Sequence, residues 1–173
     1  MIQRILELEK QNERLQELAA FDGLTKISNQ RTLLHYLKGK IKEADRMRKP
    51  LCLAMFDIDD FKRINDSKGH VYGNLVLTRV ASIIQDNIRE TDLAGRFGGD
   101  EFMVILTNTD LTVAQGIAER IRQVVEKTVF ADGLRVTISG GVKQYNSETL
   151  MDLIHFADMN LYKAKGHGKN RIR

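Results

Sequence analysis

The sequence is poor in the residues that build disulfide-linked, cysteine-metal and membrane-spanning proteins. It has one cysteine, one proline and no tryptophan among 173 residues. Because Cys52 has no second cysteine to pair with and lies in an apolar stretch, we expect no disulfide framework and place it in the core. No apolar run approaches the roughly 20 residues that span a bilayer, and the charged N-terminus lacks the apolar block of a signal peptide. We therefore expect a cytoplasmic protein with no membrane contact in this segment.

The excess of positive over negative charge is also small. Lys and Arg number 27 against 23 Asp and Glu, which gives a net charge of +4. The chain lacks the long basic run of a nucleic-acid-binding arm, so we expect no nucleic acid partner, whereas small anionic ligands fit this balance. The densest basic stretch is KAKGHGKNRIR, residues 163–173, which is interpreted either as a solvated tail or as a contact for phosphate.

Residues 1–20 have the pattern of a separate helix. Apolar residues and one asparagine recur at alternating spacings of four and three, at Met1, Ile5, Leu8, Asn12, Leu15 and Ala19. Asn12 on such a seam favours a parallel two-stranded coiled coil. Because the seam is short, a linker helix packed on its own domain explains these residues equally well. We divide the chain into this helix, 1–20, and one domain over 21–173.

The domain alternates helix and strand patterns. Apolar periodicity predicts a short helix from near Phe61, a last helix over 150–161 that Ser147 can cap, and long helices around 33–44, 75–88 and 112–126. Apolar runs predict strands at 51–58 and 135–142 and a hairpin with arms at 92–97 and 101–107. From the first strand onward the order is β, α, β, β, α, β, which is the α+β arrangement of ferredoxin-like folds. In that topology the first strand lies in the middle of the sheet, beside the hairpin.

The hairpin carries the sequence RFGGDEF, residues 96–102. Gly98 and Gly99 predict a tight turn, since glycine adopts positive φ without steric cost. Asp100 and Glu101 then begin the returning strand, where neighbouring side chains point to opposite faces. In a ferredoxin-like sheet this tip can approach the end of the first strand, which would make Asp57 and Asp100 neighbours.

Converging carboxylates repel each other unless a cation offsets the charge or catalysis requires it. Mg²⁺, or Mn²⁺, suits such a site because magnesium takes oxygen ligands, one or two of them protein carboxylates, and completes its shell with water and phosphate. The histidines are scattered, which argues against zinc, at His35, His70, His155 and His167. Each acidic residue alone has a plainer interpretation: Asp57 and Asp59 could cap the helix near Phe61, and Asp100 could solvate a turn.

Five blocks in order carry a family resemblance. They are DGLT (22–25), DIDDFKRINDSKGH (57–70), RFGGDEF (96–102), AERIR (118–122) and LYKAKGHGKNR (161–171). Together they resemble the GGDEF family of diguanylate cyclases, which condense two GTP molecules into cyclic di-GMP and pyrophosphate. The resemblance implies a catalytic domain of the nucleotidyl cyclase and polymerase-palm type.

The resemblance also implies roles for individual residues. Asp57, Asp100 and the backbone carbonyl of Ile58 match metal ligands, and Glu101 matches a residue assigned to metal binding or activation of the attacking hydroxyl. These acidic side chains form the implied catalytic set. Positions matching substrate contacts are Phe61, Lys62, Asn65, Asn74, Gly98, Gly99, Lys165 and Lys169. Among them, the lysines match triphosphate contacts and Asn65 matches a contact to guanine.

Two further features follow from the resemblance. RETD, residues 89–92, matches an inhibitory motif in which product binds Arg89 and Asp92, with Arg120 as a third contact. Because each domain of such an enzyme holds one nucleotide, two domains must face each other. This favours a homodimer paired through residues 1–20.

The match departs from the family pattern at one informative position. Asn74 stands in GHVYGN where the family has aspartate, and replacing one acceptor with a donor should weaken guanine selectivity. Gly140 is a lesser departure. We therefore keep three hypotheses: a diguanylate cyclase, a cyclic dinucleotide synthase that accepts ATP as well as GTP, and a catalytically weak receptor for GTP or cyclic di-GMP.

Overall fold

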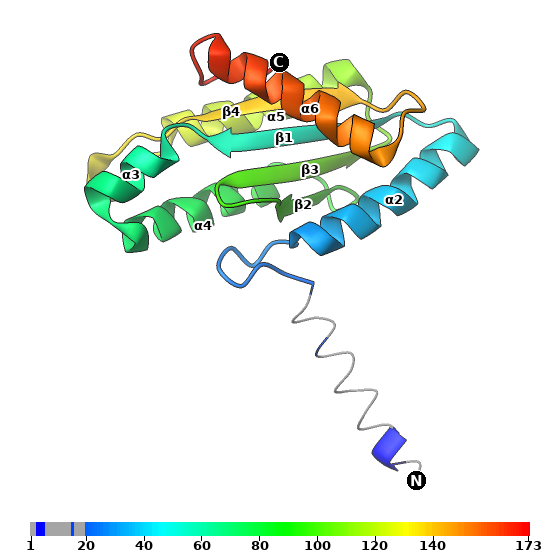
Figure 1. Cartoon of the computed structure of the whole chain (residues 1–173), viewed down its shortest axis with the longest axis horizontal. Helices are drawn as coiled ribbons and strands as arrows, with labels where there is room; N and C mark the ends of the chain where they lie inside the picture. The colour runs from blue at the N-terminus through cyan, green and yellow to red at the C-terminus, as the bar shows by residue number, and fades with distance from the viewer. Residues whose placement is uncertain (1–2, 6–14, 16–19) are drawn as a thin grey trace.

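The computed structural model describes residues 3–5, 15 and 20–173. Most of the helix expected over 1–20, and with it the coiled-coil seam, lies outside the described residues, so its pairing stays a prediction. The domain has a four-stranded antiparallel sheet with helices on both faces (Figure 1). Its elements are α2 (Gln30–Met47), β1 (Leu51–Ile58), α3 (Phe61–Lys68), α4 (His70–Asp86), β2 (Leu93–Arg96), β3 (Glu101–Thr107), α5 (Leu111–Lys127), η1 (Ala131–Gly133), β4 (Ile138–Gln144) and α6 (Leu150–Gly166).

The strand order is β2-β3-β1-β4, and each neighbouring pair is antiparallel. This is the ferredoxin-like arrangement predicted from the order of elements. β1 lies between β3 and β4, so its carboxyl end reaches the tip of the β2–β3 hairpin at the left-hand end of the sheet in Figure 1. The predicted neighbourhood of the first strand and the hairpin is confirmed.

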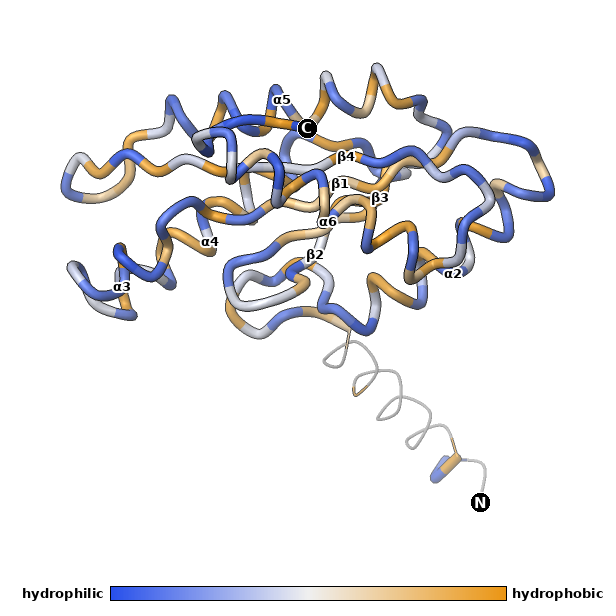
Figure 2. Tube along the Cα trace, turned by 45° about the horizontal axis from the view of Figure 1, so that its top comes forward, coloured by the Kyte–Doolittle hydropathy of each residue, from blue (hydrophilic) through white to orange (hydrophobic). Residues whose placement is uncertain are grey.

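The core has two layers because β1 is buried along its whole length. Alternate residues point to opposite faces: Cys52, Ala54 and Phe56 pack with α4 and α5, and Leu53 and Met55 pack with α2 and α6. Figure 2 shows the central strands as a largely hydrophobic trace between helices of mixed polarity. Cys52 is buried and not bonded to another cysteine, as expected. A strand covered on both faces explains why 51–58 is apolar without alternation.

The cap of α6 and the start of β4 differ from the prediction. Thr149, not Ser147, caps α6 through a hydrogen bond from the Asp152 amide to its hydroxyl, because Ser147 has a φ of 65°, outside the extended conformation of an N-cap. The last strand begins at Ile138 rather than 135, since β1 ends at Ile58, directly opposite Ile138. Arg135 instead forms an isolated bridge with Val129.

The C-terminal residues do not form a solvated tail. The Gly140 amide donates to Arg171 O at 2.9 Å, and the Arg173 amide donates back to Gly140 O at 2.9 Å, in a parallel bridge along β4. A Cβ at Gly140 would lie 2.7 Å from Ile172 Cδ1 and 2.9 Å from Cδ1 of buried Phe56, so glycine favours the close packing of this segment. The tail therefore fixes the end of α6 against the sheet.

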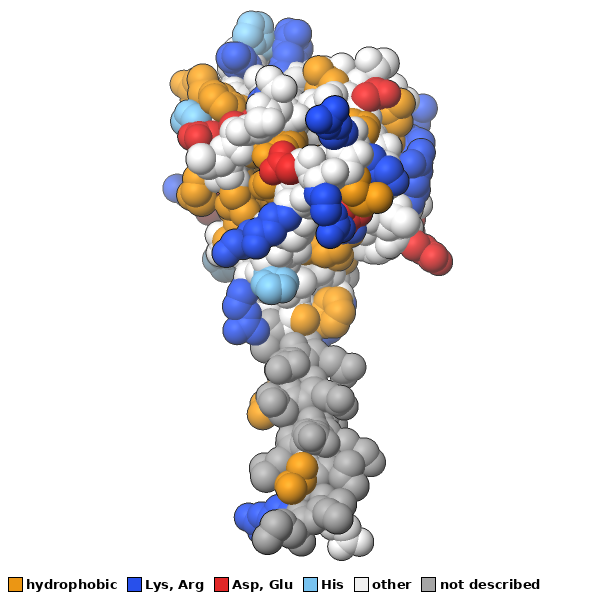
Figure 3. Space-filling view, turned by 90° about the vertical axis from the view of Figure 1, so that its right-hand side faces the viewer, with side chains coloured by type: hydrophobic (Ala, Val, Ile, Leu, Met, Phe, Trp, Pro, Cys, Tyr) orange, Lys and Arg blue, Asp and Glu red, His pale blue; other side chains and the backbone are white. Residues whose placement is uncertain are grey.

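The surface agrees with the balanced charge of the sequence. Figure 3 faces the end of the sheet opposite the hairpin tip, and its Lys and Arg side chains are interspersed with hydrophobic and acidic ones. Among the described residues, no helix combines the length and apolarity needed to cross a bilayer.

Candidate active site at the end of the central strand

The end of β1 and the tip of the hairpin bring three acidic residues together. Asp57 is the register partner of Glu101, one residue before β1 ends. The Ile58 amide donates to the backbone oxygen of Asp100 at 3.2 Å, which ties the strand end to the first residue after the glycine pair. The acidic side chains predicted to meet therefore come from directly adjacent backbone.

The glycine pair is not required by its φ angles. Neither Gly98 nor Gly99 has a positive φ, so the expected left-handed turn is wrong. Instead, a Cβ at Gly98 would clash with Oε2 of Glu101, whose side chain folds back over the turn. Among the described residues, nothing lies within 4 Å of the Cβ position of Gly99. The tip is thus bare backbone that a ligand can approach closely.

Burial makes the charge on these carboxylates costly. The pKa of Asp57 is raised to about 6, chiefly by burial and further by Asp100 and Glu101, although the Lys165 ammonium 2.7 Å away opposes the rise. The pKa of Glu101 is also raised, first by burial and then by Asp158 and Asp100. A site that disfavours its own negative charge in this way is suited to a cation.

The donor set fits a hard divalent cation. Among the described residues, no group of three or more His, Cys, Asp or Glu side chains forms a preformed metal cluster. Mg²⁺ does not need one, since it commonly takes one or two carboxylates and fills its shell with water and phosphate oxygens. Asp57 and Asp100, joined by the backbone at Ile58, supply oxygen donors of this kind. The residues present therefore fit Mg²⁺ or Mn²⁺ that arrives with a phosphorylated ligand.

The loop between β1 and α3 lies beside these carboxylates and, within the described part of the chain, leaves backbone amides without a side-chain cap. Asp59 is buried and does not cap α3; it accepts from the Thr137 and Ser139 hydroxyls, each at 2.7 Å. Asp60 is the N-cap of α3, with φ of 55° and no side-chain capping bond among the described residues. The amides of the first turn of α3 are consequently left for another acceptor, and a phosphate group provides one.

The lysines matched to triphosphate contacts surround this loop. Lys62 lies exposed in the first turn of α3. Lys165, in the last turn of α6, pairs with Asp57, and Lys169 places its ammonium 2.6 Å from Oδ1 of Asp60. Two lysines from the C-terminal segment therefore contact acidic residues at the end of β1 and the start of α3, and Lys62 lies on α3 beside them in the chain.

The residues matched to base recognition lie where α3 crosses α4. A Cβ at Gly73 would clash with Oδ1 of Asn65 and lie 3.2 Å from Phe61 Cζ, so glycine allows the two helices to touch. Oδ1 of Asn65 is buried and accepts no hydrogen bond within the described residues. Asn74 follows Gly73 on α4, and its side chain is exposed. The structure thus brings Phe61 and Asn65 together at Gly73, whereas no contact joins the Asn74 side chain to them among the described residues.

Comparison with known proteins decides the family. Residues 19–171 match the family described as "Diguanylate cyclase, GGDEF domain". The chain belongs to the GGDEF family.

Relatives of this GGDEF domain are named for cyclase activity. It is 40% identical over 169 residues to diguanylate cyclase A of Treponema denticola, covering 93% of this chain and 46% of that protein. It is 38% identical over 156 residues to diguanylate cyclase DosC of Escherichia coli, covering 87% of this chain and 34% of that protein. The chain thus spans less than half the length of these curated relatives.

Solved structures agree with the fold. The coiled coil and GGDEF domain of DgcB from Caulobacter crescentus, in complex with c-di-GMP, has a TM-score of 0.93 at 30% identity, covering 99% of this chain and 93% of that one. The GGDEF domain of the same protein alone has a TM-score of 0.86 at 32% identity, covering 89% of this chain and 94% of that one.

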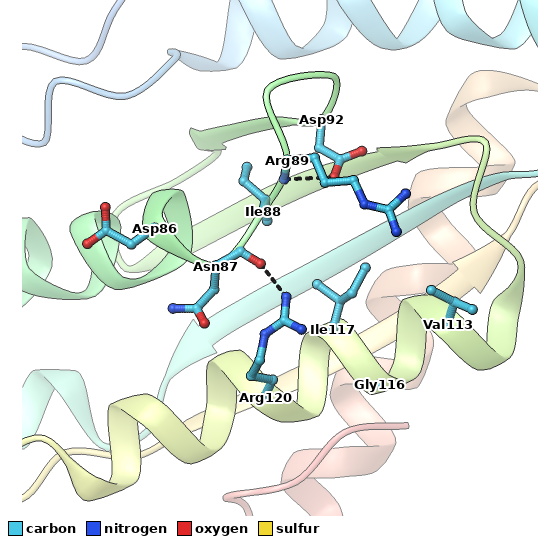
Figure 4. A pocket seen from close by; sticks show the side chains of 9 residues that line it. All are labelled: Asp86, Asn87, Ile88, Arg89, Asp92, Val113, Gly116, Ile117 and Arg120. Atoms are coloured by element: carbon cyan, nitrogen blue, oxygen red, sulfur yellow. Dashed lines mark hydrogen bonds between the residues drawn. The ribbon is translucent and has the colours of Figure 1, made fainter.

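The predicted inhibitory residues of the GGDEF domain form a separate pocket. RETD lies at the start of β2, at the end opposite the hairpin tip, and faces α5 across an open pocket of about 600 Å³ (Figure 4). The Arg120 guanidinium donates to Asn87 O at 2.7 Å. Buried Asp92 accepts from the Arg89 amide at 3.1 Å and the Thr107 amide at 3.0 Å. The structure brings Arg89 and Arg120 together, while Asp92 also holds the turn.

Sequence reasoning missed how Arg96 links the hairpin to the start of the domain. Its guanidinium donates to Gly99 O at 3.1 and 2.6 Å and contacts both carboxylate oxygens of Asp22 at 3.4 Å. Asp22, the first residue of DGLT, also accepts from the Thr25 amide and hydroxyl. The available signal was a charged residue at a strand end, two residues before a glycine pair. Arg96 therefore connects the backbone of the hairpin tip, at Gly99, to the segment that precedes α2, at Asp22.

Proposed function

We propose that the domain is a diguanylate cyclase, which condenses two GTP molecules into cyclic di-GMP with release of pyrophosphate. The observation that carries the proposal is the meeting of Asp57 with Asp100 and Glu101, beside Lys165 and the first turn of α3. Curated relatives at 38 to 40% identity are named diguanylate cyclases, which supports the same reaction.

The residues divide the work at one nucleotide. Asp57, Asp100 and the Ile58 carbonyl would hold Mg²⁺ or Mn²⁺, and such a cation neutralises phosphate charge and makes a hydroxyl a better nucleophile. Lys62, Lys165 and Lys169 bind the triphosphate together with the amides of α3. Gly98 and Gly99 leave room for the nucleotide at the hairpin tip. The Glu101 carboxylate would either join the cation ligands or accept the proton of the attacking 3′ hydroxyl.

Ligand binding requires the lysines to change partners. In the structure Lys165 pairs with Asp57 and Lys169 pairs with Asp60. These contacts keep both ammonium groups at the site before a triphosphate arrives. On binding, phosphate oxygens replace the carboxylates as lysine partners, and Asp57 becomes free to act as a cation ligand.

The reaction needs two domains. The 3′ hydroxyl of one nucleotide attacks the α-phosphorus of the other, so a second domain must present its nucleotide face to face. We propose a homodimer paired through residues 1–20, because a tether of this kind raises the effective concentration of one half-site at the other.

Base selectivity is the point where a second candidate function arises. Asn65 has a buried side-chain oxygen without a partner among the described residues, and rotation of this amide away from Gly73 would present it to an N–H group of guanine. Asn74 offers a donor as well as an acceptor, a pattern that also suits adenine. We therefore keep a synthase that accepts ATP as well as GTP. Incubation with a mixture of GTP and ATP tests the relaxed selectivity. A mixed-base cyclic dinucleotide supports it, whereas formation of the di-guanine product alone excludes it.

The pocket at Arg89 suits product binding. Two arginines that border one open pocket can bind phosphates or guanine edges, and cyclic di-GMP offers both. A pure receptor is less favoured, because it leaves the complete set of carboxylates and lysines at the end of β1 without a role.

The test of the proposed function is direct. Purified protein incubated with GTP and Mg²⁺ should form cyclic di-GMP and pyrophosphate, and the Asp100→Ala variant should form neither while folding normally. Product formation at the wild-type rate by Asp100→Ala, or none by a folded dimeric wild type, contradicts the proposal.

A further inference from the structure

A buried arginine on α5 contacts the loop that follows α6. Arg122 is 9% exposed. Its guanidinium donates to Glu119 at 2.7 and 2.9 Å, to Glu126 at 2.9 Å and to Oδ1 of Asn170 at 2.6 Å. The side-chain Nδ2 of Asn170 in turn donates to the other carboxylate oxygen of Glu126 at 2.7 Å. Asn170 is thus held through both ends of its side chain.

The backbone of Asn170 contacts the loop between β1 and α3. The Asn170 amide donates to Oδ2 of Asp59 at 3.0 Å, and Asp59 in turn accepts from Thr137 and Ser139. The preceding residue, Lys169, places its ammonium at Asp60. Asn170 therefore joins α5 to the loop between β1 and α3, and it directly follows Lys169.

The backbone of residues 168–170, which follow α6, has an unfavourable conformation that needs support from these contacts. Gly168, Lys169 and Asn170 have φ of 107°, 62° and 46°, so three consecutive residues are left-handed, and two of them carry a Cβ. Backbone of this kind persists only where surrounding contacts hold it, and it concentrates at functional sites. Asparagine tolerates this region better than most residues and can also accept from Arg122 while donating to Glu126.

We propose that Arg122 and Asn170 are positioning residues for the nucleotide triphosphate. They hold the 168–170 loop in its left-handed form, which directs Lys169 toward the phosphates. Neither residue is assigned a contact with substrate. The inference rests on the proposed function, because the proposed substrate supplies the triphosphate, and it deepens that function by assigning the group that aims the lysine.

A pair of variants separates this role from a general contribution to stability. Asn170→Gly keeps the left-handed backbone accessible and removes both side-chain hydrogen bonds, and Arg122→Met removes the guanidinium but keeps a long side chain. Glu119→Gln is the matched control, since Glu119 pairs with Arg122 but does not touch Asn170. Thermal unfolding monitors whether each variant is folded at the assay temperature.

The readout compares ligands with and without a triphosphate. Both variants should bind a non-hydrolysable GTP analogue about tenfold more weakly, and bind GMP within about twofold of wild type. In turnover, the KM for GTP should rise about tenfold while kcat changes by less than about threefold. Glu119→Gln should match wild type in all three measurements.

Other results distinguish failure of the positioning role from failure of the proposed function. Equal losses for GMP and the GTP analogue, or wild-type affinity for both ligands in both variants, would overturn the positioning role while leaving the cyclase proposal intact. A wild type that binds the analogue but makes no product overturns the proposed function, and the binding comparison still judges the positioning role. A wild type that binds no triphosphate overturns both.

Discussion

The Lys165 ammonium lies 2.7 Å from Oδ1 of Asp57 and joins the last turn of α6 to the end of β1. The lysine side chain is 36% exposed and that of Asp57 is 10% exposed, so the pair joins a partly hydrated cation to a nearly dry anion. Because the pKa of Asp57 still rises to about 6, the lysine compensates only part of the cost of burial. An added cation would offset the remaining cost of the Asp57 charge.

The first prediction concerns the stability of Asp57→Asn. Since the folded pKa of Asp57 is raised from 3.8 to about 6, folding favours its protonated form, and its contribution to stability is lost as pH rises through this window. Asparagine avoids that loss. Without nucleotide or divalent cation, the variant should be more stable than wild type by on the order of 2 kcal/mol at about pH 8, and equal to it at about pH 4. Urea unfolding at both pH values measures this; a variant less stable at both contradicts the burial argument.

The second prediction concerns the pH dependence of catalysis. Protonated Asp57 cannot hold a cation, so kcat/KM should fall as pH decreases through about 6. Because Mg²⁺ competes with the proton, raising the Mg²⁺ concentration should move this acid limb to lower pH. Rate profiles at two Mg²⁺ concentrations test the idea, and a limb that does not move would show that another group controls it.

The third prediction concerns Gly99→Ala. The Cβ has open space among the described residues and φ is not left-handed, so stability should change by less than about 0.5 kcal/mol. Activity should nevertheless fall by about 100-fold or more, because the methyl group lies where the nucleotide approaches. Gly39→Ala on α2, which also has open space, is the control and should keep full activity. Equal activity in the two variants would remove the hairpin tip from the site.

The fourth prediction concerns product inhibition. Arg89 is exposed at the pocket, so Arg89→Ala should abolish inhibition by cyclic di-GMP and leave the initial rate unchanged. Asp92 is the poorer target, since its carboxylate accepts from two backbone amides and its loss would destabilise the turn. Initial rates with added product measure the effect, and undiminished inhibition would place the product elsewhere.

Much of the fold was predictable from local pattern. The apolar run at 51–58 and the hairpin around RFGGDEF predicted the central strand and its neighbour, because burial on both faces leaves a continuous apolar stretch. The start of β4 could not be predicted in this way, because it depends on where β1 ends. Cap choice between Ser147 and Thr149 depended on backbone φ, which composition does not determine.

The candidate site divides in the same way. Asp57, Asp100 and Glu101 could be paired from topology, since strand order places their backbones side by side. The contacts of Arg122 with Asn170 and of Arg96 with Asp22 could not, because each joins side chains from segments 48 and 74 residues apart with no periodic signal. Gly98 and Gly99 were expected to adopt positive φ, and neither does, because the conformation of a turn is not determined by its composition.

The most direct test of the account is the cation dependence of nucleotide binding. Calorimetric titration with a non-hydrolysable GTP analogue should show binding that strengthens at least about tenfold with Mg²⁺. Asp57→Asn and Asp100→Asn should each remove that enhancement while the domain stays folded. Equal affinity with and without Mg²⁺, or an enhancement that survives both substitutions, would contradict a shared cation site at the end of β1 and the hairpin tip.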